Sequence, residues 1–387
     1  MSRDVPSLRR VERFLKTLVL SVLRGIFRLR RVSPFDPARF SRILVIRQHN
    51  QLGDMLCVTP LLRALRARYP GAFLALLTSP VNHEVMLHHA ALDTVINFDK
   101  RDFLSGKTFH LVALWRFVRS LRARSFDLVL VPATVSTSTT SDVLAYLTGA
   151  RTRIGAGSIN GKPNPSAFLY THERHLSWPD GQPRHQTERN MDVADLLMLP
   201  PLDRSLDLTL TPEERSTGLT RLRELTDNVR PVIAYHVGAG KPPNRWPADK
   251  FAMLINLLGK EFEAAALLIS GPMDEGPVSD VMGRLSVRHY LLEKQEIRIV
   301  ASCLASADLL VSNDTGIMHV GAASGVPVLS LFGPTDPRQW APCGTCHRYI
   351  QSRSGDISSI AVEEVAEKAR GMLRSAGAPQ TGSSTCL

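Results

Sequence analysis

The residues best suited to chemistry follow an apolar run in the second half of the chain. Residues 313–316 read Asn-Asp-Thr-Gly, and the helical stretch that begins there carries His319. Asp314 or Thr315 can cap that helix, whose first N–H groups lack partners within the helix and attract anions. Gly316 allows a phosphate to approach closely, and His319 can donate a hydrogen bond to it. The turn predicts a diphosphate site; the alternative is an ordinary cap beside a buried histidine.

A second turn offers positive charge. Residues 235–241 read Tyr-His-Val-Gly-Ala-Gly-Lys after another apolar run, and residues 244–247 read Asn-Arg-Trp-Pro. Lys241 and Arg245 can supply fixed positive charge to a leaving diphosphate, which is the role that a metal ion plays in other transferases. The alternative is that one of the two is a solvated loop charge.

A third turn, near the start of the chain, carries a carboxylate. Asp54 lies where the expected strand Ile43–Ile46 meets its helix. A carboxylate at such a position is commonly a helix cap. Facing a cleft, it can instead accept a proton from an acceptor hydroxyl. The spacing alone does not decide between these roles.

Strands and helices must position these turns. Short apolar runs alternate with helical stretches, which predicts parallel, doubly wound sheets that are buried on both faces. The expected strands are Ile43–Ile46, Phe73–Leu77, Thr94–Phe98, Asp127–Val131, Val232–Tyr235, Ala265–Ile269, Leu309–Ser312 and Val326–Leu331, and the expected helices are Met55–Tyr69, Leu111–Arg124, Asp249–Leu258, Ile297–Ala305, Gly316–Ala323 and Val362–Leu373.

The repeated pattern predicts an α/β protein with two Rossmann-like domains that face a central cleft, at residues 41–205 and 206–356. Ligands are expected at the carboxyl ends of the strands. Residues 151–185, rich in Gly, Pro, Asn and His, are expected to form an irregular excursion outside the core. A helix is expected within residues 357–375, and residues 376–387 are expected to form a disordered tail.

The net charge of +11 is unevenly distributed over the 387 residues. Residues 1–40 carry +7 of it, so the rest is nearly balanced, which argues against nucleic acid as a partner. Apolar residues at helical spacing among arginines predict a basic amphipathic helix over residues 8–31 that lies on an anionic membrane surface. The alternative is a helix that packs on the body or mediates oligomerisation. Apolar runs stay below the ~18 residues of a spanning helix.

The cysteine count and the absence of complete cofactor-binding motifs argue against disulfide-rich proteins, nicotinamide dehydrogenases and P-loop proteins. Five cysteines in so long a chain fit a reducing cytoplasm rather than a disulfide framework. Cys343 and Cys346 form a lone C-x-x-C, for which a loop is expected rather than a metal or redox site. The first strand is followed by one glycine, Gly53, instead of G-x-G-x-x-G, which argues against a nicotinamide dehydrogenase. Gly106-Lys107-Thr108 lacks the earlier glycine of a P-loop.

The motifs together resemble glycosyltransferase family 9, the ADP-heptose:lipopolysaccharide heptosyltransferases. The resemblance follows the family's motif order and covers residues 42–350 or so, in both halves of the chain. It implies a GT-B fold with the acceptor on the N-terminal half and the nucleotide-sugar on the C-terminal half. The matching segments are Ile46-Arg47, Leu52-Gly53-Asp54, Thr59-Pro60, His236-Val237-Gly238-Ala239, Arg245-Trp246-Pro247, residues 312–319, Ala322-Ala323, Val326-Pro327-Val328 and residues 331–337.

By position, the resemblance implies roles for particular residues. Asp54 is similar to the general base, and Asp314 to the residue that holds the sugar of the donor. The other implied donor contacts are Thr315, Gly316 and His319 at the diphosphate, Gly238 in the loop after the strand, Asp274 or Glu275 at the ribose, and Gln295 near the adenine. One position departs from the family: Asn244 stands where the first basic residue before Trp-Pro is expected, and Lys241 or Arg245 would then supply the charge.

The implied reaction is an inverting, metal-independent transfer of a heptose from ADP-heptose to an inner-core sugar of lipopolysaccharide. ADP-heptose is a co-substrate in that reaction, and no cofactor is expected. The acceptor would be a lipid-linked oligosaccharide, which a peripheral enzyme meets at the cytoplasmic face of the inner membrane. The alternatives are a transferase of the same fold that uses another nucleotide-sugar for a surface polysaccharide or glycoconjugate, and a non-catalytic member of the family.

Overall fold

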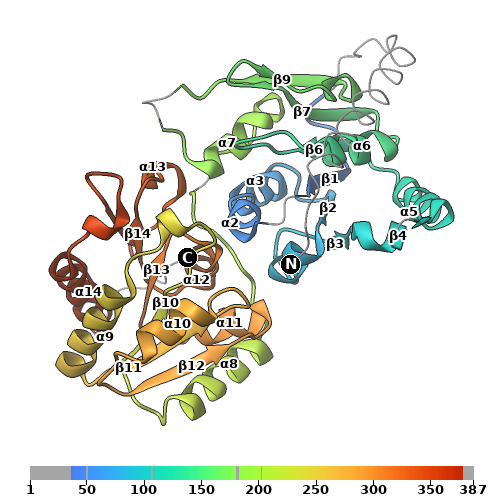
Figure 1. The fold of residues 1–387 in the computed structure, drawn as a ribbon. Helices are drawn as coiled ribbons and strands as arrows, with labels where there is room; N and C mark the ends of the chain where they lie inside the picture. Colours follow the sequence, from blue (N-terminus) through green and yellow to red (C-terminus); the bar gives the residue numbers. More distant parts are fainter. Residues whose placement is uncertain (1–35, 49–50, 106–107, 180–182, 202, 378–387) are drawn as a thin grey trace.

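The protein consists of two α/β halves stacked end to end (Figure 1). The computed structural model describes residues 36–48, 51–105, 108–179, 183–201 and 203–377. The amphipathic helix expected over residues 8–31 lies outside the described residues, as does the expected tail beyond Gly377. Within the described part, no helix is both long and apolar enough to cross a membrane.

The N-terminal half is built on a seven-stranded sheet in the described residues, with strand order β3-β2-β1-β6-β7-β8 and β9 paired with β7. Its strands from β3 to β7 are all parallel. The strands are β1 (Arg42–Arg47), β2 (Phe73–Thr78), β3 (Thr94–Asn97), β6 (Leu128–Val131), β7 (Thr152–Ile159), β8 (Lys162–Pro163) and β9 (His172–Leu176), with a separate hairpin of β4 (Leu104–Ser105) and β5 (Thr108–Phe109); the helices are α2 (Leu52–Leu56), α3 (Thr59–Arg68), α4 (Pro80–Met86), α5 (Leu111–Ala123), α6 (Thr139–Leu147) and α7 (Gln186–Val193).

The C-terminal half is built on a six-stranded parallel sheet in the order β12-β11-β10-β13-β14-β15. In chain order this is 3-2-1-4-5-6, the order of a Rossmann sheet. The strands are β10 (Val232–His236), β11 (Ala265–Ser270), β12 (His289–Glu293), β13 (Leu309–Asn313), β14 (Val328–Phe332) and β15 (Arg348–Gln351), and the helices are α8 (Pro212–Leu225), α9 (Ala248–Phe262), α10 (Glu275–Met282), α11 (Ile297–Leu304), α12 (Gly316–Ser324), α13 (Pro337–Trp340) and α14 (Val362–Gly377).

Central strands of both sheets are buried along their whole length, as their uninterrupted apolar composition predicts. β6, β10, β11 and β13 contain no exposed residue. Helices cover both faces of these strands, so apolar side chains on either face of the sheet are removed from water. The two doubly wound sheets of the sequence prediction are therefore present.

The amphipathic stretch Met55–Tyr69 was expected to form one helix, and this expectation is wrong. Instead, α2 ends at Leu56 and α3 begins at Thr59. Pro60 has no N–H to donate to the carbonyl of Leu56, so the helix cannot continue through that position. The Oγ1 atom of Thr59 donates to this carbonyl at 2.8 Å and satisfies it.

The expectation of an irregular excursion over residues 151–185 is also wrong. β7 pairs with both β6 and β9, and Ile154, Ala156 and Leu176 belong to the apolar core. The strand signal is obscured because β7 contains two glycines. A Cβ on Gly155 would lie 2.1 Å from Cζ of Tyr170, so packing rather than strand propensity selects this residue. At the other end of the chain, α14 continues to Gly377, past the predicted limit of 375.

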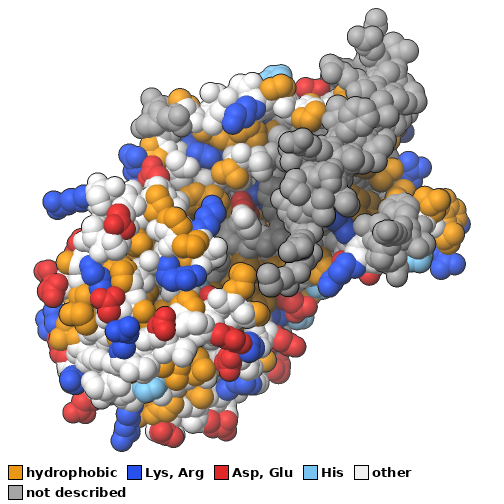
Figure 2. All heavy atoms as spheres, viewed as in Figure 1, with side chains coloured by type: hydrophobic (Ala, Val, Ile, Leu, Met, Phe, Trp, Pro, Cys, Tyr) orange, Lys and Arg blue, Asp and Glu red, His pale blue; other side chains and the backbone are white. Residues whose placement is uncertain are grey.

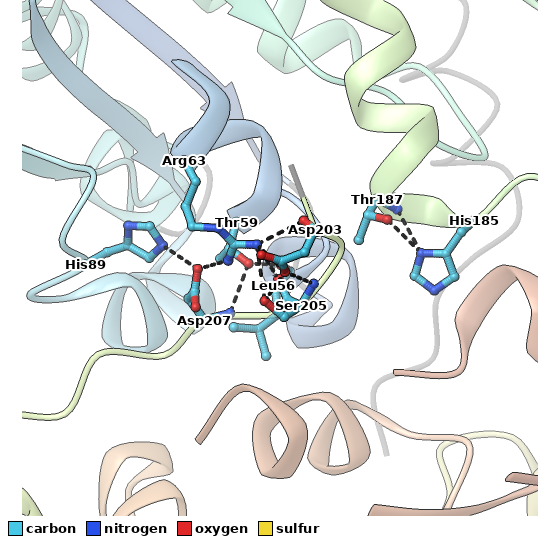
Figure 3. A network of polar contacts seen from close by, with 9 residues as sticks. All are labelled: Leu56, Thr59, Arg63, His89, His185, Thr187, Asp203, Ser205 and Asp207. Atoms are coloured by element: carbon cyan, nitrogen blue, oxygen red, sulfur yellow. Dashed lines mark hydrogen bonds and ion pairs between the residues drawn. The ribbon is translucent and has the colours of Figure 1, made fainter. Parts of the chain in front are cut away.

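The segment between the halves is held by the N-terminal half (Figure 3). Arg63 of α3 donates to the carbonyls of Asp203 and Ser205 at 3.1 and 3.0 Å, and it forms ion pairs with Asp203 and Asp207. Thr59 Oγ1 accepts the N–H of Asp207 at 3.1 Å. Side chains of α3 thus fix the path of the connection.

Contacts between the halves are both polar and apolar. Arg298 of α11 donates to the carbonyl of Glu84, at the end of α4, at 2.9 Å, while it forms a bidentate ion pair with Glu214 of α8. Arg189 of α7 donates to Gln339 of α13 at 3.0 Å. One apolar cluster extends from the N-terminal half into the C-terminal half. These contacts hold the two strand-end turns opposite each other.

Candidate active site

A buried ion pair lies at the carboxyl end of β1. Arg47, the last residue of that strand, donates to Oδ1 of Asp54 at 2.8 Å, and each side chain is only 2% exposed. Thr134, which follows β6, donates to the same Oδ1 at 3.1 Å. Arg47 also donates to the carbonyl of Pro132 at 3.0 Å. These contacts hold the Asp54 carboxylate in one orientation and place a cation beside it.

The helix that carries Asp54 packs directly on the helix that follows β13, so α2 and α12 meet where the two halves face each other (Figure 1). Glycines make this approach possible. A Cβ on Gly53 would lie 2.6 Å from Cδ2 of His319, and one on Gly316 would lie 3.2 Å from Cβ of Leu52. The structure thereby brings Asp54 and the predicted diphosphate turn together, although they are separated by some 260 residues of sequence.

His319 is buried in this contact, 3% exposed, with its ring edge-on to Trp340. Burial lowers the pKa of His319 to about 4, with a further lowering from His185 and an opposing effect of Asp54. The imidazole is therefore neutral at pH 7. Its Nδ1 atom is buried without a hydrogen-bond partner. A neutral ring with one unused nitrogen can still donate a hydrogen bond to an anion.

The first turn of α12 keeps its backbone N–H groups free of side-chain caps. Thr315 is the N-cap residue, yet its side chain makes no capping hydrogen bond. Its Oγ1 atom instead lies 3.1 Å from Nδ1 of His236, the last residue of β10. The unpaired N–H groups at the start of a nine-residue helix form a site for an anion such as a diphosphate.

His236 continues this chain of contacts toward Asp274. Its Nε2 atom lies 3.4 Å from Oδ2 of Asp274, which also accepts the N–H of Gly271 at 2.9 Å. The hydrogen bond from His236 is the main cause that lowers the pKa of Asp274. Gly238 lets this carboxylate approach, because a Cβ there would lie 1.9 Å from Oδ1. Asp274 thus lies against the loop after β10.

The side chains of Glu275 and Gln295 make their contacts away from the turns described above. Glu275 is exposed and forms an ion pair with Lys294. Gln295 accepts from Arg221 at 2.8 Å and donates to the carbonyl of Glu293 at 2.8 Å. Of the two acidic residues considered for the ribose, Asp274 is the one next to the other predicted donor residues.

Asn244 is connected directly to Asp314. Its Nδ2 donates to Oδ2 of Asp314 at 3.0 Å and to Oγ1 of Thr335 at 3.3 Å. Burial raises the pKa of Asp314, while Thr335 and the nearby Lys241 lower it. A neutral amide therefore holds this carboxylate at the position where the sequence resemblance expects a basic residue.

The two candidate cations differ in their surroundings. Lys241 is exposed and close enough to Asp314 to affect its pKa. Arg245 is half-buried, donates to the carbonyl of Ala239 at 3.0 Å and contributes to the lowered pKa of Asp274. Lys241 therefore lies toward the predicted sugar site, whereas Arg245 binds the loop after β10 near Asp274, on the predicted ribose side.

Sequence reasoning missed several residues that build these turns. Asn313 donates to the carbonyls of Val237 and Gly238 at 3.0 and 3.1 Å and accepts the N–H of Trp246 at 3.1 Å, so it joins three segments. Asn313 and His236 lie inside recognised motifs, which was a usable signal. Thr134 has no such signal, because only the folded sheet brings it to Asp54.

A narrow pocket of about 10 Å³, which is room for a single water molecule, adjoins Arg47 in the N-terminal half. Its lining includes hydroxyl and amide groups, from Ser136, Thr137, Ser138, Ser141 and Asn164.

The cysteine pair does not form a metal site in the described residues. Cys343 lies 3.7 Å from Nε2 of His185, and Cys346 lies beside its neighbour His347. No group of three or more His, Cys, Asp or Glu side chains within the described ranges is arranged to hold a metal ion.

Two Rossmann-type halves with their strand ends facing each other define the GT-B fold of glycosyltransferases. The family model described as "Glycosyltransferase family 9 (heptosyltransferase)" matches residues 114–368. The chain belongs to this family, and it is a glycosyltransferase.

Relatives support this assignment at low identity. Lipooligosaccharide heptosyltransferase 2 of Haemophilus influenzae is 27% identical over 162 residues, which are 40% of this chain and 46% of that protein. Lipopolysaccharide heptosyltransferase 3 of Escherichia coli K12 is 25% identical over 305 residues, which are 75% of this chain and 82% of that protein.

Solved structures have the same fold. The family 9 glycosyl transferase of Veillonella parvula has a TM-score of 0.77 and 22% identity, and the match covers 88% of this chain and 99% of that one. The E. coli heptosyltransferase WaaC with ADP has a TM-score of 0.69 and 21% identity, with 86% and 99% covered. The GT-B architecture expected from the sequence is confirmed.

Proposed function

We propose that the protein transfers a heptose from ADP-heptose to an inner-core sugar of lipopolysaccharide, with inversion at the anomeric carbon and without a metal ion. The observation that carries the proposal is the contact between α2 and α12. It sets the carboxyl group of Asp54, which Arg47 holds in place, beside the uncapped helix start at Thr315 and Gly316. A single displacement at the anomeric carbon needs a base for the acceptor hydroxyl on one side and a site for the leaving diphosphate on the other.

In the proposed mechanism, Asp54 takes the proton of an acceptor hydroxyl, and the oxygen attacks the anomeric carbon of the donor. The bond from that carbon to the diphosphate breaks on the opposite face, and ADP leaves with the electron pair. Inversion follows from the single step. The N–H groups of α12 and the ammonium group of Lys241 would stabilise the growing negative charge, and one such donor is worth roughly 3–4 kcal/mol.

Arg47 and Thr134 are positioning residues in this mechanism. Both bind Oδ1 of Asp54, so the carboxylate cannot rotate freely. On the donor side, Asp314 would hold the sugar, and Asp274 the ribose.

The choice of donor is supported by the names of the relatives and by the ADP bound in one related structure. Transfer to a lipid-linked acceptor, followed by mass spectrometry, tests it directly. We expect product with ADP-heptose and none with UDP-sugars, and a larger rise in melting temperature with ADP than with UDP. We also expect transfer activity to be unchanged when a metal chelator is added. If the chelator abolished activity and added metal ions restored it, metal independence would be contradicted.

A second candidate is a transferase of the same fold with another nucleotide-sugar. It is favoured by Asn244, whose neutral amide contacts Asp314 where a cation is expected. Product with a different donor, and the absence of product with ADP-heptose, would select this candidate. Mass spectrometry of lipopolysaccharide from a strain that lacks this protein identifies both the acceptor and the transferred sugar, because the core oligosaccharide ends just before the sugar that the enzyme would add.

We further propose that the enzyme works on the inner face of the cytoplasmic membrane, where residues 8–31 contact anionic lipid. Seven of the eleven net positive charges precede residue 41. A basic residue near anionic lipid contributes about 1 kcal/mol before screening. Removal of residues 1–38 is expected to weaken binding to anionic vesicles and to leave transfer to a detergent-solubilised acceptor intact. Unchanged vesicle binding would contradict this role.

A further inference from the structure

Helix α5 presents an apolar face to solvent. Leu111, Val112 and Trp115 are 70%, 61% and 58% exposed, and they occupy its first two turns. Single exposed apolar residues are ordinary, but three large ones side by side on one helix mark an interaction surface. We call these three residues the α5 apolar face.

This face is not needed to hold the helix on the body. The opposite side of α5 does that: Leu121 is buried, and the ring of Phe117 packs against Phe98 and Phe103 at centroid distances of 5.2 and 5.7 Å. The helix is therefore anchored by one apolar stripe and carries a second one outward. The second stripe has no partner in the described structure.

The charges of α5 itself have one sign, although Asp102 of the neighbouring turn Lys100–Phe103 is exposed. Residues 103–126 contain no Asp or Glu. Arg116 and Arg119 are exposed on α5, and the guanidinium of Arg119 lies 5.3 Å from the ring centre of Trp115. Figure 2 shows orange and blue side chains together at the right-hand edge of the molecule, where Figure 1 places α5. Apolar side chains flanked by arginines are the surface that an anionic lipid headgroup layer binds.

We propose that α5 docks on an anionic lipid surface, with Leu111, Val112 and Trp115 among the first methylene groups of the acyl chains and with Arg116 and Arg119 at the headgroup phosphates. The absence of acidic residues on α5 favours lipid over a second copy of this chain, which would bring the like charges of two α5 helices together. Tryptophan and arginine are also the residues that favour the membrane interface. This contact is separate from that of residues 8–31 and does not depend on which sugar is transferred.

Trp115 reports the contact in the full-length chain. Vesicles of phosphatidylglycerol and phosphatidylethanolamine with brominated acyl chains quench the fluorescence of a tryptophan that enters the bilayer. Of the other three tryptophans, Trp178 and Trp246 are buried, at 4% and 1% exposure, and Trp340 is half-buried against His319, so all three are less accessible to such quenching than Trp115. We expect quenching of the wild-type chain, loss of most of it in Trp115→Phe, and little with phosphatidylcholine vesicles. Equal quenching in both chains, or none in either, would overturn the proposal.

Affinity supplies the second readout. Arg116→Gln with Arg119→Gln should weaken binding to the anionic vesicles by about five-fold for each arginine lost, because each contributes a lipid-dependent attraction. The matched controls lie on the other half: Arg353→Gln removes an exposed arginine and Met253→Ser an exposed apolar residue, and both should bind as wild type. Analytical sedimentation in solution measures the oligomeric state and so tests whether a second copy of the chain binds the α5 apolar face. A dimer that the α5 substitutions dissociate, with vesicle binding unchanged, would assign the face to a second copy instead.

Discussion

The two sides of the candidate site are built by opposite electrostatic means. On the N-terminal side, Arg47 and Asp54 form an ion pair that is almost completely removed from water. On the C-terminal side, neutral amides do the positioning: Asn313 joins the loops and Asn244 holds Asp314, while the cation Lys241 remains exposed.

This difference fits the proposed tasks. A general base must stay ionised and fixed throughout the cycle, so a permanent buried partner suits it. A diphosphate brings its own charge and leaves with it. Because Lys241 is exposed, the donor side avoids the cost of an unpaired buried ammonium group whenever it is empty.

Removal of the base should have the largest effect. Asp54→Asn keeps an oxygen that can accept from Arg47 and Thr134 but cannot take a proton. We expect kcat to fall by about 10²–10⁴-fold, with donor affinity unchanged. Single-turnover transfer and ADP titration measure the two quantities. The control is Asp308→Asn, which alters an ion-paired carboxylate far from the site. A variant of Asp54 with near wild-type turnover would show that the ion pair is only structural.

Acid should weaken the structure mainly through buried histidines. Burial lowers the pKa of His89, His185, His319 and His347 to about 4 each. Below pH 6.5 the unfolded chain binds protons that the folded one does not, so the free energy of unfolding falls as pH falls from 6.5 toward 4. The slope is up to about 1.4 kcal/mol per pH unit for each histidine.

Urea unfolding between pH 7 and pH 5 measures that slope. Asp142 and Asp314, whose pKa values burial raises, act in the opposite direction, so a variant is needed to isolate the histidines. His89→Gln should reduce the slope, and His88→Gln, at the exposed neighbouring position, should not. A slope that is equal in all three chains would contradict the assignment to His89.

The contact between the two sides can be disturbed by one methyl group. Gly53→Ala places a Cβ within 3 Å of the His319 ring, so the ring or α2 must shift. Overpacking of this kind costs about 1–3 kcal/mol. We expect the melting temperature and kcat to fall together, because the base moves away from the donor site. Gly71→Ala is the control, since nothing lies within 4 Å of a Cβ there. An unaltered kcat in Gly53→Ala would separate the contact from catalysis.

The smallest effect is expected from the neutral amide of the donor side. Asn244→Ala leaves the half-buried Asp314 carboxylate with one hydrogen-bond donor fewer, which costs about 1–3 kcal/mol. Donor KM should rise about ten-fold with a smaller change in kcat. Asn256→Ala, which removes an amide on the outer side of α9, should leave both constants unchanged. A fall in KM would instead mean that Asn244 holds Asp314 away from the sugar.

Much of the fold follows from local sequence. β6 is apolar throughout and β10 is apolar up to its last residue, His236, and such short runs are typical of central parallel strands. The break before Thr59 was available from Pro60. In contrast, β7 contains glycines because Tyr170 and Glu173 occupy the space of their missing side chains. The requirement for glycine in β7 comes from residues 15 or more positions away, so the local sequence pattern does not predict it.

The site was predictable to the same extent. Motifs placed Asp54, Thr315 and Gly316 in two turns, and the GT-B arrangement explains why turns so distant in sequence face each other. The partners of these residues were not predictable: Thr134 meets Asp54 across 80 residues, and His236 meets Thr315 across 79. Spacing in sequence carries no information about such pairs.

The anchoring of the connecting segment determines where the molecule can bend. Arg63 and Thr59 tie it to the N-terminal half as far as Asp207, and the next residue, Leu208, donates its N–H to Ala323 of the C-terminal half at 3.0 Å. The connecting segment therefore contacts the N-terminal half up to Asp207 and the C-terminal half from Leu208 onward. Because Arg63 and Thr59 hold the chain up to Asp207 while Leu208 is bound to the other half, we expect a rotation of one half against the other to change backbone dihedral angles at Asp207 and Leu208.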